Sequence, residues 1–176
     1  MSIFGDMDEE EIDQLPDDPW EIKDDWYFVS ITKAWEVQEE DGEERYWLRL
    51  TMSVEEPDND YHGMPVRLRF QIFPREDSET VEQYKQRMKH LSGDDKRDIA
   101  RLKQFCQQGL DLKPAEMVSF VTSDFIGYKL HVQVKNRKSN KEGDTRKFPN
   151  VVDFLSERLY EERGLKKDEA SESLGF

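Results

Sequence analysis

Cysteine, histidine and long apolar runs are all scarce in this sequence of 176 residues. Cys106 is the single cysteine and only three histidines are present, which excludes an internal disulfide and leaves no metal-ligand spacing. No apolar run approaches the ~18 residues that span a membrane. The first 25 residues are acidic, which is unlike the basic start of a signal peptide. We therefore expect a protein of a reducing cytoplasm.

Catalytic motifs are absent as well. The sequence contains no glycine-rich phosphate loop and no serine or cysteine nucleophile motif. Its densest carboxylate cluster, Asp8 to Asp13, lies in a segment with little to fold it, whereas a nuclease holds its metal-binding acids on firm strands. Cys106 falls on the apolar stripe of an expected helix, which favours a place in the core. These absences predict a protein that is not an enzyme and needs no cofactor.

Charge is abundant but unevenly placed. Charged residues make up 38% of the chain and hydrophobic residues 35%, with a net charge of −14. Residues 1–25 hold eleven acids and only Lys23, a net charge of −10, whereas residues 26–155 have a net charge of −2. We therefore divide the chain into an acidic, flexible arm (1–25), one domain (26–155), and a short helix with a polar C-terminal tail (156–176).

Alternation of apolar and polar residues predicts five strands. Three lie before residue 74, at 26–37, 45–54 and 65–73, and two lie after residue 127, around 128–135 and 148–154. Between them, apolar residues spaced three and four apart predict a helical insertion at about 78–118. The expected fold is mainly β with inserted helices, an OB-like five-stranded antiparallel barrel. An open α+β sheet is the alternative.

The stretch from Gly127 to Phe148 is basic within an acidic protein. It holds seven Lys and Arg residues against Glu142 and Asp144, a net charge of +5. Its sequence predicts two strands joined by a polar loop. A basic hairpin of this kind indicates that an anionic ligand is held nearby.

The outward faces of three expected strands add cations and aromatic rings to this hairpin. Cations can follow phosphates while rings stack on unpaired bases, which suits single-stranded nucleic acid. Trp47 and Phe148, with Phe73, are the expected stacking residues. The alternative interpretation is an ordinary solvated sheet face with Trp47 covering a loop. The candidate nucleic-acid-binding residues are Arg45, Trp47, Arg49, Arg67, Arg69, Phe73, Lys129, His131, Lys135, Arg137, Lys138, Lys141, Arg146, Lys147 and Phe148.

Several stretches between about residues 20 and 155 resemble a known family. They are GMPVRLRF from Gly63, LKQFCQQGL from Leu102, IGYKLHV from Ile126, and FPNVV from Phe148. Their order is similar to that of small phage-encoded single-stranded DNA-binding proteins of the OB-fold type. The resemblance implies binding of single-stranded DNA in phage DNA replication or recombination, in the cytoplasm of a bacterial host.

The end of the chain is similar to the acidic tails by which such proteins recruit replication partners. Acids are followed there by the aromatic residue Phe176, which the resemblance makes a partner-binding anchor, although Lys166 and Lys167 dilute the acidity. Two other functions remain open. One is an acidic mimic of DNA that inhibits a host DNA-binding enzyme, against which the near-neutral body argues. The other is a phage structural or assembly protein.

Overall fold

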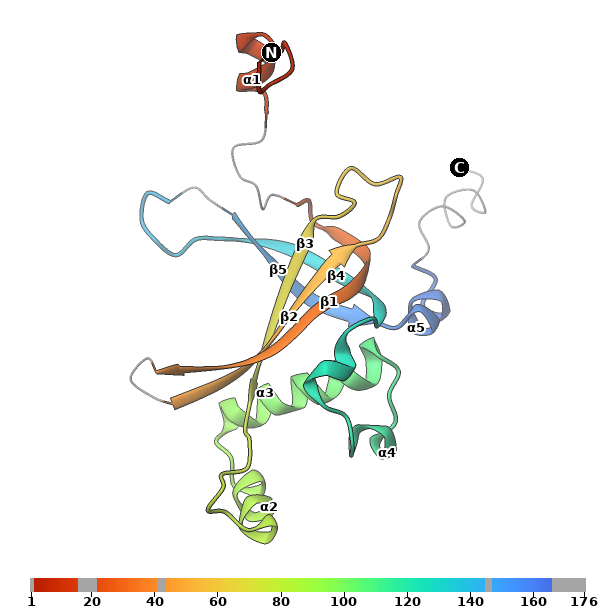
Figure 1. Cartoon of the computed structure of the whole chain (residues 1–176). Helices are drawn as coiled ribbons and strands as arrows, with labels where there is room; N and C mark the ends of the chain where they lie inside the picture. Colours follow the sequence, from red (N-terminus) through yellow and green to blue (C-terminus); the bar gives the residue numbers. More distant parts are fainter. Residues whose placement is uncertain (1, 16–21, 41–43, 145–146, 166–176) are drawn as a thin grey trace.

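A computed structural model describes residues 2–15, 22–40, 44–144 and 147–165. Its centre is a sheet of five antiparallel strands in the order β3-β2-β1-β4-β5 (Figure 1). The mainly β architecture with five antiparallel strands is confirmed. The strands are β1 (Asp25–Glu40), β2 (Glu44–Val54), β3 (Pro65–Ile72), β4 (Lys129–Lys138) and β5 (Lys147–Leu155).

The sheet curls but does not close. β3 and β5 are its two edges and contact each other, yet no ladder pairs them among the described residues. The side chain of Arg101 lies at this seam. Its Nη2 donates a hydrogen bond to the Val151 carbonyl of β5 at 3.1 Å, and its guanidinium carbon lies 5.3 Å from the ring centre of Phe70 on β3. The barrel is therefore partly open, with Arg101 bridging the gap between its edges.

The helical insertion falls between β3 and β4, as the sequence predicts. Its principal helix, α3, lies across one end of the curled sheet (Figure 1). The side chain of Ser92 caps α3 by accepting a hydrogen bond from the backbone of Asp95. The elements of the insertion are α2 (Val81–Lys89), α3 (Gly93–Gln104), a π-helical turn η1 (Phe105–Gly109), α4 (Pro114–Met117) and a 3-10 turn η2 (Thr122–Phe125).

Alternation on the strands builds one core. Alternate residues are buried from Leu48 to Val54 in β2 and from Leu130 to Val134 in β4. The ring centre of Phe105, directly after α3, lies 5.0 Å from that of Phe154 and 5.1 Å from that of Phe70. Gly109 in η1 leaves room for Leu130 to pack closely, because a Cβ atom there would lie only 3.1 Å from the Leu130 side chain. The inward residues of the two strands are Leu48, Leu50, Met52, Val54, Leu130, Val132 and Val134.

A β-bulge changes the face that β1 presents along its length. Ile31 pairs with Met52, but the next pair joins Lys33 to Thr51, which leaves Thr32 as an extra residue. Before the bulge the odd-numbered residues point inward. After it the odd-numbered residues point outward, because one inserted residue exchanges the two faces of a strand.

The two ends of the chain differ in how they meet the sheet. Within residues 2–15, α1 (Glu9–Asp13) is fully exposed and lies away from the body in Figure 1. From Ile22, which is 1% exposed, the chain packs into the core. At the other end, α5 (Glu157–Glu162) packs beside β4 and β5 through buried Tyr160. Among the described residues, no helix is both long and apolar enough to cross a membrane.

Candidate nucleic-acid interface

A groove of about 870 Å³ runs over the outward face of β1, β2 and β3 and reaches the seam beside α3 and β5. Among the described residues, its lining has six cationic side chains, a single acid, Asp98, and the rings of Trp35 and Trp47. The strand register explains the grouping, because Arg49 lies opposite both Trp35 on β1 and Arg69 on β3. The cations are Lys33, Arg49, Arg67, Arg69, Arg101 and Arg137.

Trp47 is held within the groove by a cation. The guanidinium carbon of Arg69 lies 4.4 Å from the centre of the Trp47 ring, a cation–π contact. The indole Nε1 of Trp47 and the Nε of Arg49 are both buried and have no hydrogen-bond partner in the described part of the chain. Buried donors without acceptors are costly. The cationic lining of the groove favours a ligand that brings acceptor oxygens.

Neighbouring acids and burial influence the charge of two arginines in the groove, Arg49 and Arg101. Arg49 forms an ion pair with Glu39 of β1. Burial lowers the pKa of Arg101, although the nearby Asp98 acts in the opposite direction. An arginine stays protonated at neutral pH even so. The groove therefore keeps its positive charge, with Glu39 and Asp98 offsetting part of it.

Five of the predicted residues line this groove, and they come from three strands that the sequence places far apart. The structure brings together Trp47, Arg49, Arg67, Arg69 and Arg137.

The β4–β5 hairpin carries a second group of predicted residues. The side chains of Lys135, Lys138, Lys141, Lys147 and Phe148 are exposed there, and Phe148 pairs across the strands with Arg137 of the groove. In Figure 1 this hairpin extends to the left of the sheet, on the same side as the end of β1 and the start of β2. Two other predicted residues, Arg146 and Phe176, lie outside the described residues.

The remaining predicted residues are not in the groove. Arg45 and Phe73 line a smaller adjoining hollow of about 300 Å³, which shares Gln71 with the groove. Lys129 pairs with Glu55 at 3.1 Å.

His131 is covered. Its ring stacks on that of Tyr160 with centres 3.7 Å apart and lies 4.9 Å from Phe28. Lys129 and His131 therefore belong to the end of β4 that the structure places away from the groove.

The groove residues that are missing from the set predicted from the sequence include Lys33 and Trp35 of β1, Arg101 of α3 and Asn150 of β5. The bulge at Thr32 explains the first two, because a constant alternation from Tyr27 would turn them inward. Arg101 lies on a helix whose position over the seam depends on tertiary packing. The cation and tryptophan two residues apart in β1 are the signal that could have identified this strand.

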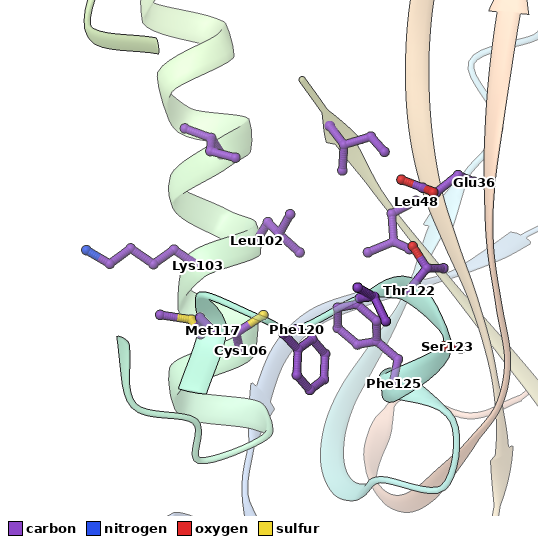
Figure 2. Close-up of a pocket in the computed structure, with 13 residues that line it drawn as sticks. Glu36, Leu48, Leu102, Lys103, Cys106, Met117, Phe120, Thr122, Ser123 and Phe125 are labelled. Atoms are coloured by element: carbon purple, nitrogen blue, oxygen red, sulfur yellow. The ribbon is translucent and has the colours of Figure 1, made fainter. Parts of the chain in front are cut away.

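A second hollow, of about 660 Å³, lies between α3, η2 and the ends of β1 and β2 (Figure 2). It is mostly apolar, and Leu102, Met117, Phe120 and Phe125 are among the residues that line it. Cys106 also faces this space, and burial raises the pKa of its thiol to about 11. The expected place of Cys106 in the core is thereby confirmed. Within the part of the chain described, no cluster of three or more His, Cys, Asp and Glu side chains could hold a metal ion.

Comparison with known proteins adds little to this geometry. No protein-family model matches the chain, and no curated protein matches it. One solved structure that does match is described as yeast RPA bound to ssDNA. It is 14% identical in sequence, the alignment covers 87% of this chain and 88% of that one, and the TM-score is 0.33.

Proposed function

We propose that this protein binds single-stranded DNA in the groove over β1, β2 and β3, without catalysis. The observation that carries the proposal is the lining itself, which combines six cations and two tryptophan rings with only one acid among the described residues. Phosphates would meet the cations, and unpaired bases would meet the rings. Paired bases in a duplex keep their faces stacked on one another, so the rings favour a single strand.

The β4–β5 hairpin extends this surface. Arg137 is in the groove, and the exposed cations Lys138, Lys141 and Lys147 continue from it along the hairpin. A strand crossing the sheet would therefore keep phosphate contacts beyond the groove. Exposed Phe148, opposite Arg137, offers a further ring for stacking.

The biological setting that we propose is phage DNA replication or recombination. The support is the sequence resemblance to phage-encoded single-stranded DNA-binding proteins. In that setting the tail ending at Phe176 would recruit a replication or recombination protein.

The test is titration of the protein against fluorescent oligo-dT at several salt concentrations. Replacing Arg67 and Arg69 together with alanine should weaken binding and flatten the dependence of log K on log salt. The slope should fall by about 0.7 for each phosphate that the variant no longer neutralises. The matched control replaces Lys85 and Lys89 of α2, which lie outside the groove, so that the same charge is removed.

Three results would contradict the proposal. One is a wild-type protein that does not bind oligo-dT at low salt, as expected of a DNA mimic or an assembly protein. Another is equal weakening by the groove variant and its α2 control. The last is a preference for duplex DNA over oligo-dT.

A further inference from the structure

We propose that the acidic segment 2–15 is an internal competitor that can bind the DNA groove of its own chain and is displaced from it by DNA. This inference rests on the proposed function of the groove and adds its regulation. It requires that the segment be complementary to the groove, able to reach it, and displaced by DNA.

Complementarity is evident in both charge and apolar character. Segment 2–15 contains six acids and no Lys or Arg, whereas the described lining of the groove has six cations and one acid. Its carboxylates can take the place of phosphates. The segment also exposes apolar side chains, including Ile3 at 93%, Phe4 at 46% and Met7 at 45%. Phe4 offers a ring to the tryptophans, as a base would.

The segment has a preformed local structure, yet all of its residues are exposed. The Asp8 and Glu11 side chains form a reciprocal capping box with the backbone at the start of α1. A helix of five residues gains little stability by itself in water. Its exposed apolar side chains are therefore available for contact with another surface.

The chain that follows the segment is anchored at one end of the groove. The side-chain nitrogen of Asn136 donates to the Ile22 carbonyl at 2.6 Å and to the Asp24 carboxylate at 2.8 Å, and its backbone nitrogen donates to that carboxylate at 2.7 Å. These hydrogen bonds hold the Asp24 pKa below its ordinary value. The next residue, Arg137, lines the groove.

The chain between Leu15 and Ile22 is long enough for the segment to contact the groove. Seven residue steps join Leu15 to Ile22, and an extended chain covers at most about 3.5 Å per step. The segment can therefore meet the groove beside Arg137. A tether this short gives an effective concentration of the order of millimolar, so contacts that are individually weak can compete with DNA.

The first experiment neutralises part of the segment in the full chain. Replacing Glu9, Glu10 and Asp13 with Gln, Gln and Asn leaves the capping box intact. Affinity for oligo-dT should rise about fivefold at low salt, and the gain should shrink as salt increases, because exposed charges are screened beyond about 8 Å at physiological ionic strength. The control replaces Asp58, Asp60 and Asp77 with Asn and changes the net charge equally.

The control separates a specific contact from general repulsion of DNA by an acidic protein. An equal gain in both variants would overturn the proposal, and so would no gain in the segment variant. Loss of DNA binding in every variant would instead contradict the proposed function of the groove.

A second experiment tests the contact without DNA. A synthetic peptide of residues 2–15 contains no tryptophan, so it can be titrated into the Glu9→Gln, Glu10→Gln, Asp13→Asn protein while tryptophan emission is recorded. We expect a saturable change that shrinks in a Trp35→Phe receptor, is lost when Trp47 is replaced with Phe as well, and persists in a Trp26→Phe receptor, and oligo-dT should reverse it. A change that depends on Trp26 instead, or no change at millimolar peptide, would overturn the proposal.

Discussion

The two halves of β1 carry similar side chains on their outward faces and end in opposite environments. In the first half, Phe28 lies beside His131, and Tyr160 of α5 packs against both His131 and Trp26, with the ring centres of Trp26 and Tyr160 5.7 Å apart. In the second half, Lys33 and Trp35 line the open groove. Composition alone does not distinguish the two halves. What distinguishes them is α5, a later segment of the chain that covers the first half and not the second.

This difference separates stability from binding. On the α5 side, aromatic rings are already stacked on one another, and Lys129 is paired with Glu55. Their interactions are satisfied within the chain. On the groove side, cations outnumber acids, and the Nε1 of Trp47 lacks an acceptor among the residues described. We therefore expect the first side to contribute to folding stability, and it is the second side for which we propose ligand binding.

The largest effect is expected on the covered side. Tyr160→Ala removes a ring that is 6% exposed and stacked on His131, so it should lower the free energy of unfolding by about 3 kcal/mol, as large-to-small changes in a core do. Urea denaturation measures this loss. Affinity of the folded protein for oligo-dT should stay within about twofold of wild type, and a larger loss would place Tyr160 in the interface.

The converse change is Trp35→Ala on the groove side. Trp35 is 37% exposed, so its removal should change the urea midpoint little. Binding of oligo-dT should lose about 1–3 kcal/mol, the usual contribution of one stacked base. Titration and denaturation of the same preparation give both quantities. If Trp35→Ala destabilised the fold and left affinity unchanged, the two halves of β1 would not differ as described.

A smaller effect is expected from the ion pair in the groove. Glu39→Gln should free Arg49 for phosphate and tighten binding about two- to fivefold, in keeping with the roughly 0.4–1 kcal/mol of a partly exposed pair. The matched control is Glu55→Gln, which removes the partner of Lys129 on the covered side. Equal tightening in both variants would show that only net charge matters.

Most of the fold could be predicted from the sequence because local patterns determine it. The alternation in β2, β3 and β4 follows from the burial of one face of each strand, and the spacing of apolar residues in α2 and α3 follows from the helical repeat. Closure of the barrel could not be predicted. It depends on how far β3 and β5 approach each other and on the reach of Arg101 between them, and neither is a local property.

The candidate site was less predictable for a related reason. Outward-facing cations on β2 and β3 follow from alternation, and the structure brings Arg49, Arg67 and Arg69 together. Lys33 and Trp35 did not follow, because the bulge in β1 reverses the faces. His131 has the same alternation as the groove cations, yet α5 covers it. No strand pattern reveals which later element will pack over it.

Photocrosslinking tests the central claim most directly, because it reports which face of the sheet contacts DNA. Oligo-dT carrying 5-iodouracil can be irradiated with the wild-type protein, and the crosslinked residues identified by mass spectrometry. Binding in the groove predicts crosslinks at Trp35, Trp47 and Phe148, all abolished by excess unlabelled oligo-dT. Crosslinks concentrated at Trp26, His131 or Tyr160 would contradict it.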